Sequence, residues 1–511
     1  MKISEVLNGV YDRAVGWRPA SGAIKPVHIA NGLFRDLLGE RYRIDRVVAF
    51  AVPWKKKGDP EPDRNRTWDH LVNDLVDPTF AAFKAPYLKD RFEQLREFVR
   101  GLLAADQAVF PDADYTSLTL ASRQMISGDR NDRDVGRFMA HLLKGKEGNG
   151  ALAKVVIDCL KESDKPQDPL SLVVWPLLGQ DAIFLAQSNK ISPYANKDCE
   201  TFFARIEEAA DQLAQHESQQ GNRLATLQRA VLFTCLTLLG HAQALGAKGD
   251  MNKRVPLLMV PEVPKGHRLA LASEESLSRY YDAFEDWLAE ALAQRLETGD
   301  PVTYGDKPEH DERLILPAKD KESVIAFLRS IKTADKGDGK EPMNDLLEER
   351  LSLYERALVK HTAANWNRVI GDTLAQSYFS EYTSGGPRDF IGGIGRKAGI
   401  IYPHFQGNSK DKRIRPSVAI LDVLVKACTP VEEPIPLPKF LDLLWERFGI
   451  VVGGRTGGSD TDHAELLRQN GIDLSPTDLA ANTQALVDQL VQIGLARRYP
   501  DNIAYVGSRN V

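Results

Sequence analysis

Apolar side chains recur at intervals of three or four residues along much of the chain, which is the spacing of amphipathic helices. Two such runs, 201–215 and 223–245, follow each other closely and are expected to form an antiparallel helix pair. A third helix is expected to begin at Ser273, a typical N-cap residue, and to end before Gly299. One or two long helices are predicted over 344–383, so the pattern indicates a mainly α protein with minor β structure.

A few short segments have the composition of strands instead. Residues 46–52 are rich in β-branched side chains and are stopped by Pro53. Two extended stretches, 170–175 and 182–185, are expected to pair as a small hairpin. Strands are therefore expected to be a minor part of the structure.

The last hundred residues have an order of elements of their own. Helices are predicted from Pro416 and near Pro438, a strand at 450–452, a helix capped by Ser475, and a strand pair over 495–506. This order resembles the winged-helix fold. The resemblance implies either DNA binding through the third helix or protein docking, and both alternatives stay open.

The charges of this C-terminal segment bear on the choice between DNA binding and protein docking. From residue 413 to the end there are ten Lys or Arg against twelve Asp or Glu. The predicted third helix presents Asn482, Thr483, Gln484, Asp488, Gln489 and Gln492 and no cation. Because DNA affinity depends on neutralising phosphates, this favours protein docking by that helix.

The changes of pattern divide the chain into five expected segments. These are a mixed α/β domain over 1–134, a helical domain over 135–300, a linker with long helices over 301–387, a basic glycine-rich connector over 388–415 and a winged-helix-like domain over 416–511. Because the last segment has its own helix caps and apolar faces, we expect it to fold independently.

Composition narrows the class of protein. The chain has 511 residues, 43% of them hydrophobic and 27% charged, with a formal net charge of −5. Any contact with nucleic acid must therefore come from a local patch. The four cysteines form no CxxC pair, and the amino terminus lacks the features of a signal peptide, so a reduced, cytoplasmic protein is expected. The most apolar run, 230–239, is too short to cross a bilayer, and no membrane partner is expected.

The most basic window is 388–415, with seven Lys or Arg against two Asp or Glu. Its glycines, Gly392 among them, would let the backbone approach a phosphate, and its aromatic residues offer surfaces for stacking. The alternative is a solvated interdomain loop. The candidate nucleic-acid contacts, with those of an earlier basic loop and the C-terminal hairpin, are Arg388, Arg396, Lys397, Lys410, Lys412, Arg413, Arg415, Arg497, Arg498, Lys55, Lys56 and Lys57.

Catalytic motifs give no support for an enzyme. The glycines near 393 do not complete GxGxxG, and no P-loop, HExxH or GxSxG element occurs. We therefore predict no catalytic residue, no metal ligand and no cofactor, and expect protein partners to supply any ATPase or nuclease activity. The whole chain resembles accessory subunits of bacterial anti-phage defence or DNA-processing systems, which implies a non-catalytic nucleic-acid-binding or assembly subunit. The alternative is an enzyme of another type, such as a divergent metal-dependent nuclease, with Asp45 and Lys55 to Lys57 on either side of a strand.

Overall fold

The computed structural model describes most of the chain outside the segment 42–131. The described residues are 3–19, 24–41, 94, 97, 126, 132–161, 183–184, 196–298, 302–303, 311–312, 317–332, 343–362, 364–381, 386–404, 411–454, 462–500 and 504–507. This part is mainly α-helical with short strands, as the apolar spacing predicts. The predicted strand at 46–52 lies outside the described residues.

The chain forms two compact units, which differ from the five segments expected from the sequence. Unit 1 contains 1–24, 189–212 and 233–511, and unit 2 contains 25–188 and 213–232. Each unit draws on segments that are far apart along the chain, which a division by local composition does not detect.

The described part of unit 2 includes the helices α2 (Pro26–Leu38), α6 (Val135–Lys144) and α7 (Ala151–Lys161). Helices α2 and α6 cross closely, and Gly136 permits this: a Cβ atom on Gly136 would lie only 2.3 Å from the backbone of Gly32. The strands β1 (Glu40–Arg41) and β2 (Ile183–Phe184) pair antiparallel. The second half of the predicted hairpin is therefore a strand, and its partner is β1; the first half, 170–175, lies outside the described residues.

The predicted helix pair is confirmed as α9 (Glu200–Ser218) and α10 (Arg223–Gly246), and each helix contributes residues to both units. Within the described part, α10 has the length and composition of a helix that could cross a membrane. It is mostly buried, which is typical of the core helix of a soluble protein.

The longest helix of unit 1 is α11 (Arg268–Thr298), whose 31 residues extend over roughly 46 Å. It begins five residues before the predicted cap at Ser273, so that prediction of the helix start is wrong. The Ser273 hydroxyl donates to the carbonyl of Leu258 at 2.6 Å and accepts from the amide of Ile414 at 3.0 Å. The Ser273 hydroxyl therefore links segments that are distant along the chain and does not cap the helix.

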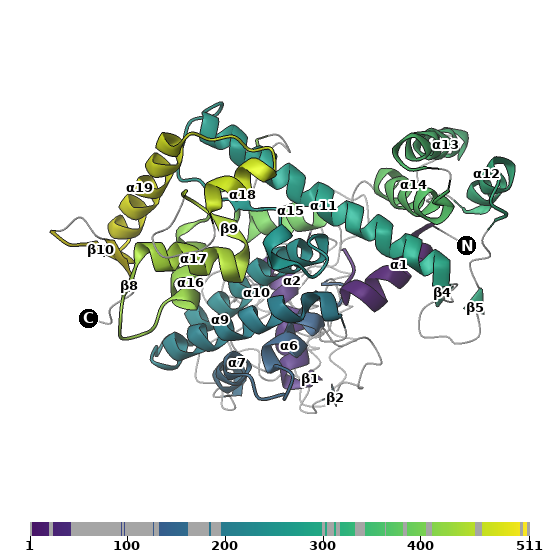
Figure 1. Cartoon of the computed structure of the whole chain (residues 1–511). Helices are drawn as coiled ribbons and strands as arrows, with labels where there is room; N and C mark the ends of the chain where they lie inside the picture. Colours follow the sequence, from purple (N-terminus) through teal and green to yellow (C-terminus); the bar gives the residue numbers. More distant parts are fainter. Residues whose placement is uncertain are drawn as a thin grey trace, which may run out of the picture. The chain divides into compact units, whose positions relative to one another are not determined.

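Three helices gather near the C-terminal end of α11: α12 (Lys321–Ser330), α13 (Met343–Lys360) and α14 (Trp366–Glu381) (Figure 1). The last two are the long helices predicted over 344–383. Arg350 of α13 is buried, donates to the carbonyls of Leu328 and Ile331 at 2.8 and 2.7 Å, and forms an ion pair with Glu381. This single side chain joins all three helices.

The segment expected as a glycine-rich connector is largely folded. It begins with α15 (Pro387–Lys397), in which Gly392, Gly393 and Gly395 are buried. It continues with the antiparallel strands β6 (Ile401–Tyr402) and β7 (Arg413–Ile414). The glycines serve close packing, since a Cβ on Gly395 would lie 2.6 Å from the Ile401 side chain.

The C-terminal helices follow the predicted order with two additions. The helices are α16 (Val418–Cys428), α17 (Leu437–Phe448), α18 (His463–Gln469) and α19 (Pro476–Gln492), and the strands are β8 (Ile435–Pro436), β9 (Ile450–Val451), β10 (Ala496–Arg498) and β11 (Ala504–Val506). The cap at Ser475 is confirmed, with a capping box to Asp478. The additions are α18 and β8, which were not predicted from the sequence pattern. Strands β10, β11 and β8 form an antiparallel sheet in that order.

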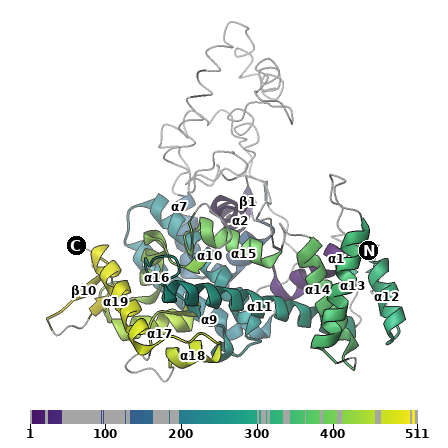
Figure 2. The same ribbon diagram turned by 90° about the horizontal axis from the view of Figure 1, so that it is seen from above.

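The core of this C-terminal segment is shared with residues before it. Strand β9 pairs in parallel with β3 (Leu257–Leu258), and one apolar cluster joins Leu258 and Leu269 to Trp445 and Leu479. Figure 2 shows α17, α18 and α19 grouped at one end of α11. The segment expected as a separate domain over 416–511 is thus completed by residues of the helical body.

The remaining elements are short. They are α1 (Ile3–Val10), the π-helix η1 (Tyr11–Val15), the 3-10 turns η6 (Lys197–Cys199) and η7 (Met251–Lys253), and the antiparallel pair β4 (Val302–Thr303) and β5 (Asp311–Glu312).

Candidate anion-binding site

Among the residues that the structure describes, most of the predicted cationic contacts are engaged within the protein. Arg388 donates to both carboxylate oxygens of Glu285 at 2.6 and 2.7 Å and also pairs with Asp282. Lys397 donates to the carbonyl of Ile24 at 2.8 Å. These two side chains therefore hold α15 in place, which limits their availability to phosphates.

The two arginines of the strand β7 region flank one tyrosine. Arg413 is buried, donates to the carbonyl of Val263 at 3.0 Å, and has its guanidinium 4.7 Å from the centre of the Tyr402 ring. Arg415 lies 4.8 Å from the same ring and pairs with Glu262 at 2.8 Å. Both interact through cation–π contacts that fix the strand pair.

The remaining predicted residues fall into three groups. Arg498 pairs with Asp488 of α19, whereas Arg497 is exposed and has no partner among the described residues. Lys410 and the loop residues Lys55, Lys56 and Lys57 lie outside the described residues. Arg396 and Lys412 are half-buried and come together near the middle of α15.

Lys412 faces a buried hydroxyl across Gly392. An ideal Cβ on Gly392 would lie 3.1 Å from the hydroxyl oxygen of Tyr281 and 3.6 Å from the Nζ of Lys412. The Tyr281 hydroxyl is buried and has no hydrogen-bond partner, and Lys412 forms no ion pair within the described part of the chain. Because Gly392 has no Cβ, these two donors, which have no partner among the described residues, can both lie close to it. We call Tyr281, Gly392, Arg396 and Lys412 the α15 cluster.

The electrostatics of the α15 cluster favour a negative ligand. Burial lowers the pKa of Lys412, and the charges of Arg396 and Arg388 lower it further against the opposing effect of Asp389. Burial raises the pKa of Tyr281, so its hydroxyl remains a donor at neutral pH. An anion between these groups would relieve the repulsion among the cations and accept a hydrogen bond from the hydroxyl.

Gly392, Arg396 and Lys412 were predicted from the basic window of the sequence, whereas Tyr281 was not. In the sequence, Tyr281 belongs to the apolar face of a long helix, and nothing in the pattern distinguishes it from its buried neighbour Tyr280. In the structure Tyr280 donates to the carbonyl of Leu239 at 3.0 Å, while the Tyr281 hydroxyl has no partner. Only the three-dimensional contacts separate the two tyrosines.

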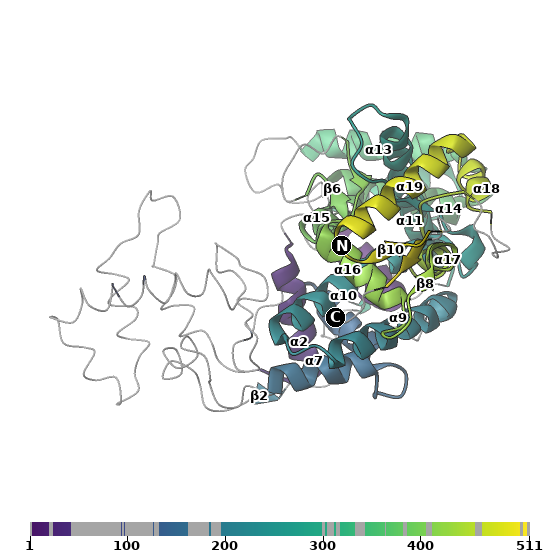
Figure 3. The same ribbon diagram turned by 90° about the vertical axis from the view of Figure 1, so that its left-hand side faces the viewer.

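The predicted third helix, α19, is not a simple reading surface. Asn482 is fully buried and donates to the carbonyls of Met259 and Val452 at 2.9 and 2.7 Å. Its amide therefore holds the helix against the body. Figure 3 shows α19 on the outside of this group of elements, and its exposed residues include Gln484, Val491 and Gln492.

Reactive groups elsewhere are buried or engaged. Burial raises the pKa of the Cys235 and Cys428 thiols to about 12, so both are protonated at neutral pH and are poor nucleophiles. His361 lies 3.2 Å from the carboxylate of Asp372, which also contacts Lys360. In the described part of the chain, no group of three or more His, Cys, Asp or Glu side chains is placed to hold a metal ion.

Comparison of the chain with known protein families, with curated proteins and with solved structures finds no match. The function therefore has to be argued from the site alone.

Proposed function

We propose that the chain is a non-catalytic, cytoplasmic subunit of a bacterial DNA-processing or anti-phage defence complex, and that it binds nucleic acid through a phosphate at the α15 cluster. One observation carries the proposal: the buried Tyr281 hydroxyl and the Lys412 ammonium, for which the described residues supply no partner, both lie close to Gly392. A phosphate oxygen is a strong acceptor that suits both donors.

The C-terminal elements support a second contact, with protein. The order α16, β8, α17, α19, β10, β11 and the sheet order β10-β11-β8 agree with a winged-helix module. The module departs from the simple pattern in the added α18 and in the pairing of β9 with β3. The exposed face of α19 carries no Lys or Arg, and Arg498 beside it is neutralised by Asp488. These features favour protein docking by α19.

The proposal is tested with the full chain in two parallel assays. A mobility-shift assay with single- and double-stranded DNA and RNA should give salt-sensitive binding, and a metal-dependent nuclease assay on the same samples should give no cleavage. Cleavage that depends on an added divalent metal would contradict the proposal and support its alternative, a divergent nuclease. Failure to bind any of these nucleic acids at low salt would also contradict the proposal.

The residue-level test compares Lys412→Ala with Lys439→Ala. Lys439 is exposed and has no partner within the described residues, so it is a matched control for loss of a charge. We expect the first variant to bind nucleic acid more weakly and the second to match the wild type.

A further inference from the structure

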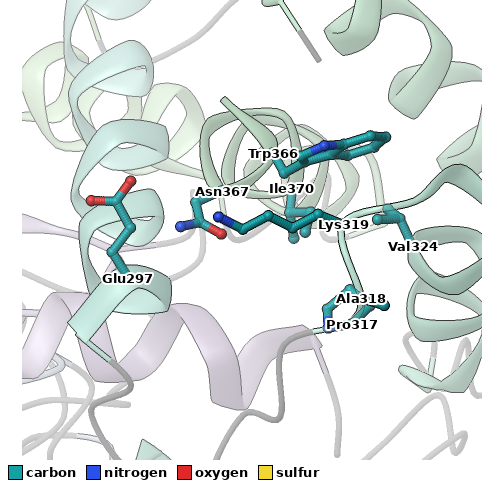
Figure 4. Close-up of a pocket in the computed structure, with 8 residues that line it drawn as sticks. All are labelled: Glu297, Pro317, Ala318, Lys319, Val324, Trp366, Asn367 and Ile370. Carbon is teal, nitrogen blue, oxygen red and sulfur yellow. The ribbon is translucent and has the colours of Figure 1, made fainter. Parts of the chain in front are cut away.

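A cavity of unit 1 lies where α11, α12 and α14 meet, and the described residues supply no partner for the polar side chains that line it. Its volume is about 240 Å³, and its lining includes Glu297 of α11, Lys319 before α12, and Trp366 and Asn367 of α14 (Figure 4). No hydrogen bond or ion pair holds any of these four side chains within the described part of the chain. The α15 cluster is a different site, since its tyrosine is 16 residues away along α11, or roughly 24 Å.

The side chains are arranged around a space. In Figure 4 the Lys319 side chain extends toward the side on which Asn367 and Glu297 lie, and the Trp366 ring is drawn above it. Glu297 and Lys319 have opposite charges but do not form an ion pair. The buried Val324 and Ile370 supply an apolar floor.

We propose that this cavity, which we call the Trp366 pocket, binds one nucleobase of a nucleotide, with Lys319 on the attached phosphate. The inference rests on the proposed function for the nature of the ligand. Trp366 supplies a flat surface on which a base stacks. The cavity volume is below the range of about 300–1,000 Å³ for drug-sized ligands, so it suits a single ring system.

The polar groups give the pocket a preference among bases. The Glu297 carboxylate is only an acceptor, and it matches the amino groups of cytosine, adenine and guanine. The Asn367 amide donates and accepts, so it pairs with any base edge. Thymine and uracil have no exocyclic amino group, so the only donor that their base edge offers to Glu297 is the single N3–H. The pocket is therefore expected to disfavour them.

The inference is tested by fluorescence anisotropy with labelled homopolymers of dC and dT and with an abasic strand of the same length. The dC strand should bind the full-length protein at least severalfold more tightly than the dT or abasic strand. Trp366→Leu should weaken dC binding by about 5-fold to 100-fold, and Trp366→Phe should retain most of it, because stacking on an aromatic ring is preserved. Glu297→Gln should reduce the difference between dC and dT.

Lys321→Ala is the control for Lys319→Ala, because both side chains are exposed and only Lys319 lines the pocket. Equal binding of the dC and abasic strands, with no effect of Trp366→Leu, would overturn the inference and leave phosphate binding at the α15 cluster intact. Competition by free cytidine monophosphate without binding of any strand would support the pocket and contradict the proposed function.

Discussion

Two adjacent tyrosines of α11 allow a sharp test of the α15 cluster. Tyr280 and Tyr281 are both buried, but only the first has a hydrogen-bond partner, the carbonyl of Leu239. Changing either residue to Phe removes one hydroxyl and nothing else. The two variants are therefore expected to change the free energy of unfolding in opposite directions.

The magnitudes follow from the environment of each hydroxyl. An unpartnered polar group in the interior costs about 1–3 kcal/mol, so Tyr281→Phe should raise the free energy of unfolding of the free protein by about 1 kcal/mol or more. Tyr280→Phe loses a made hydrogen bond and should lower it by about 1 kcal/mol. A hydrogen bond to a charged group contributes about 1.5–3 kcal/mol, so Tyr281→Phe should weaken nucleic-acid binding by about tenfold or more.

The assay combines denaturant unfolding of each variant without ligand and anisotropy with a labelled strand. If the α15 cluster binds a phosphate, Tyr281→Phe should be more stable than the wild type and bind nucleic acid more weakly. Tyr280→Phe should be less stable than the wild type and bind nucleic acid normally. If Tyr281→Phe binds nucleic acid as tightly as the wild type, the hydroxyl does not contact the anion and the reasoning is refuted.

Four further predictions concern the rest of the fold. Burial raises the pKa of Asp132 to about 7 from 3.8, so the folded state favours the protonated carboxyl and its stabilising contribution is lost as the pH rises toward and through about 7. The free energy of unfolding from denaturant melts should therefore differ less between pH 5 and pH 8 for Asp132→Asn than for the wild type. Arg350→Leu removes the cation that pairs with the buried Glu381 carboxylate and should lower the free energy of unfolding by about 3–5 kcal/mol in the same assay. Asn482→Ala should lower it by about 2 kcal/mol and leave DNA affinity, measured by anisotropy, within about twofold, since its amide bonds only the protein. The isolated segment 412–511 should give no cooperative thermal melt, because its core is completed by residues before it; a sharp melt would contradict the shared core.

Local patterns in the sequence predicted the helices well, because apolar spacing and caps are local properties. The spacing over 344–383 and the cap at Ser475 correspond to observed helices. Ser273 has the same chemistry as a cap, yet its hydroxyl bonds to Leu258 and Ile414, which are distant along the chain. Long-range hydrogen bonds of this kind leave no mark in local sequence.

The candidate site was predictable only in part, for the same reason. A count of charges identified the basic window that contains Lys412, but it did not separate Lys412 from Arg388, Arg396 and Arg413, which are engaged in internal contacts. Gly392 was predicted to let backbone approach a phosphate. In the structure its missing Cβ instead lets the side chains of other segments come together.

The salt dependence of nucleic-acid binding tests the central claim most directly. Each phosphate contact that a cation makes contributes about one unit to the slope of log affinity against log salt concentration. Measured by anisotropy over a series of salt concentrations, the slope of Lys412→Ala should be smaller than that of the wild type by about one, while Lys439→Ala should keep the wild-type slope. An unchanged slope and affinity for Lys412→Ala would contradict phosphate binding at the α15 cluster.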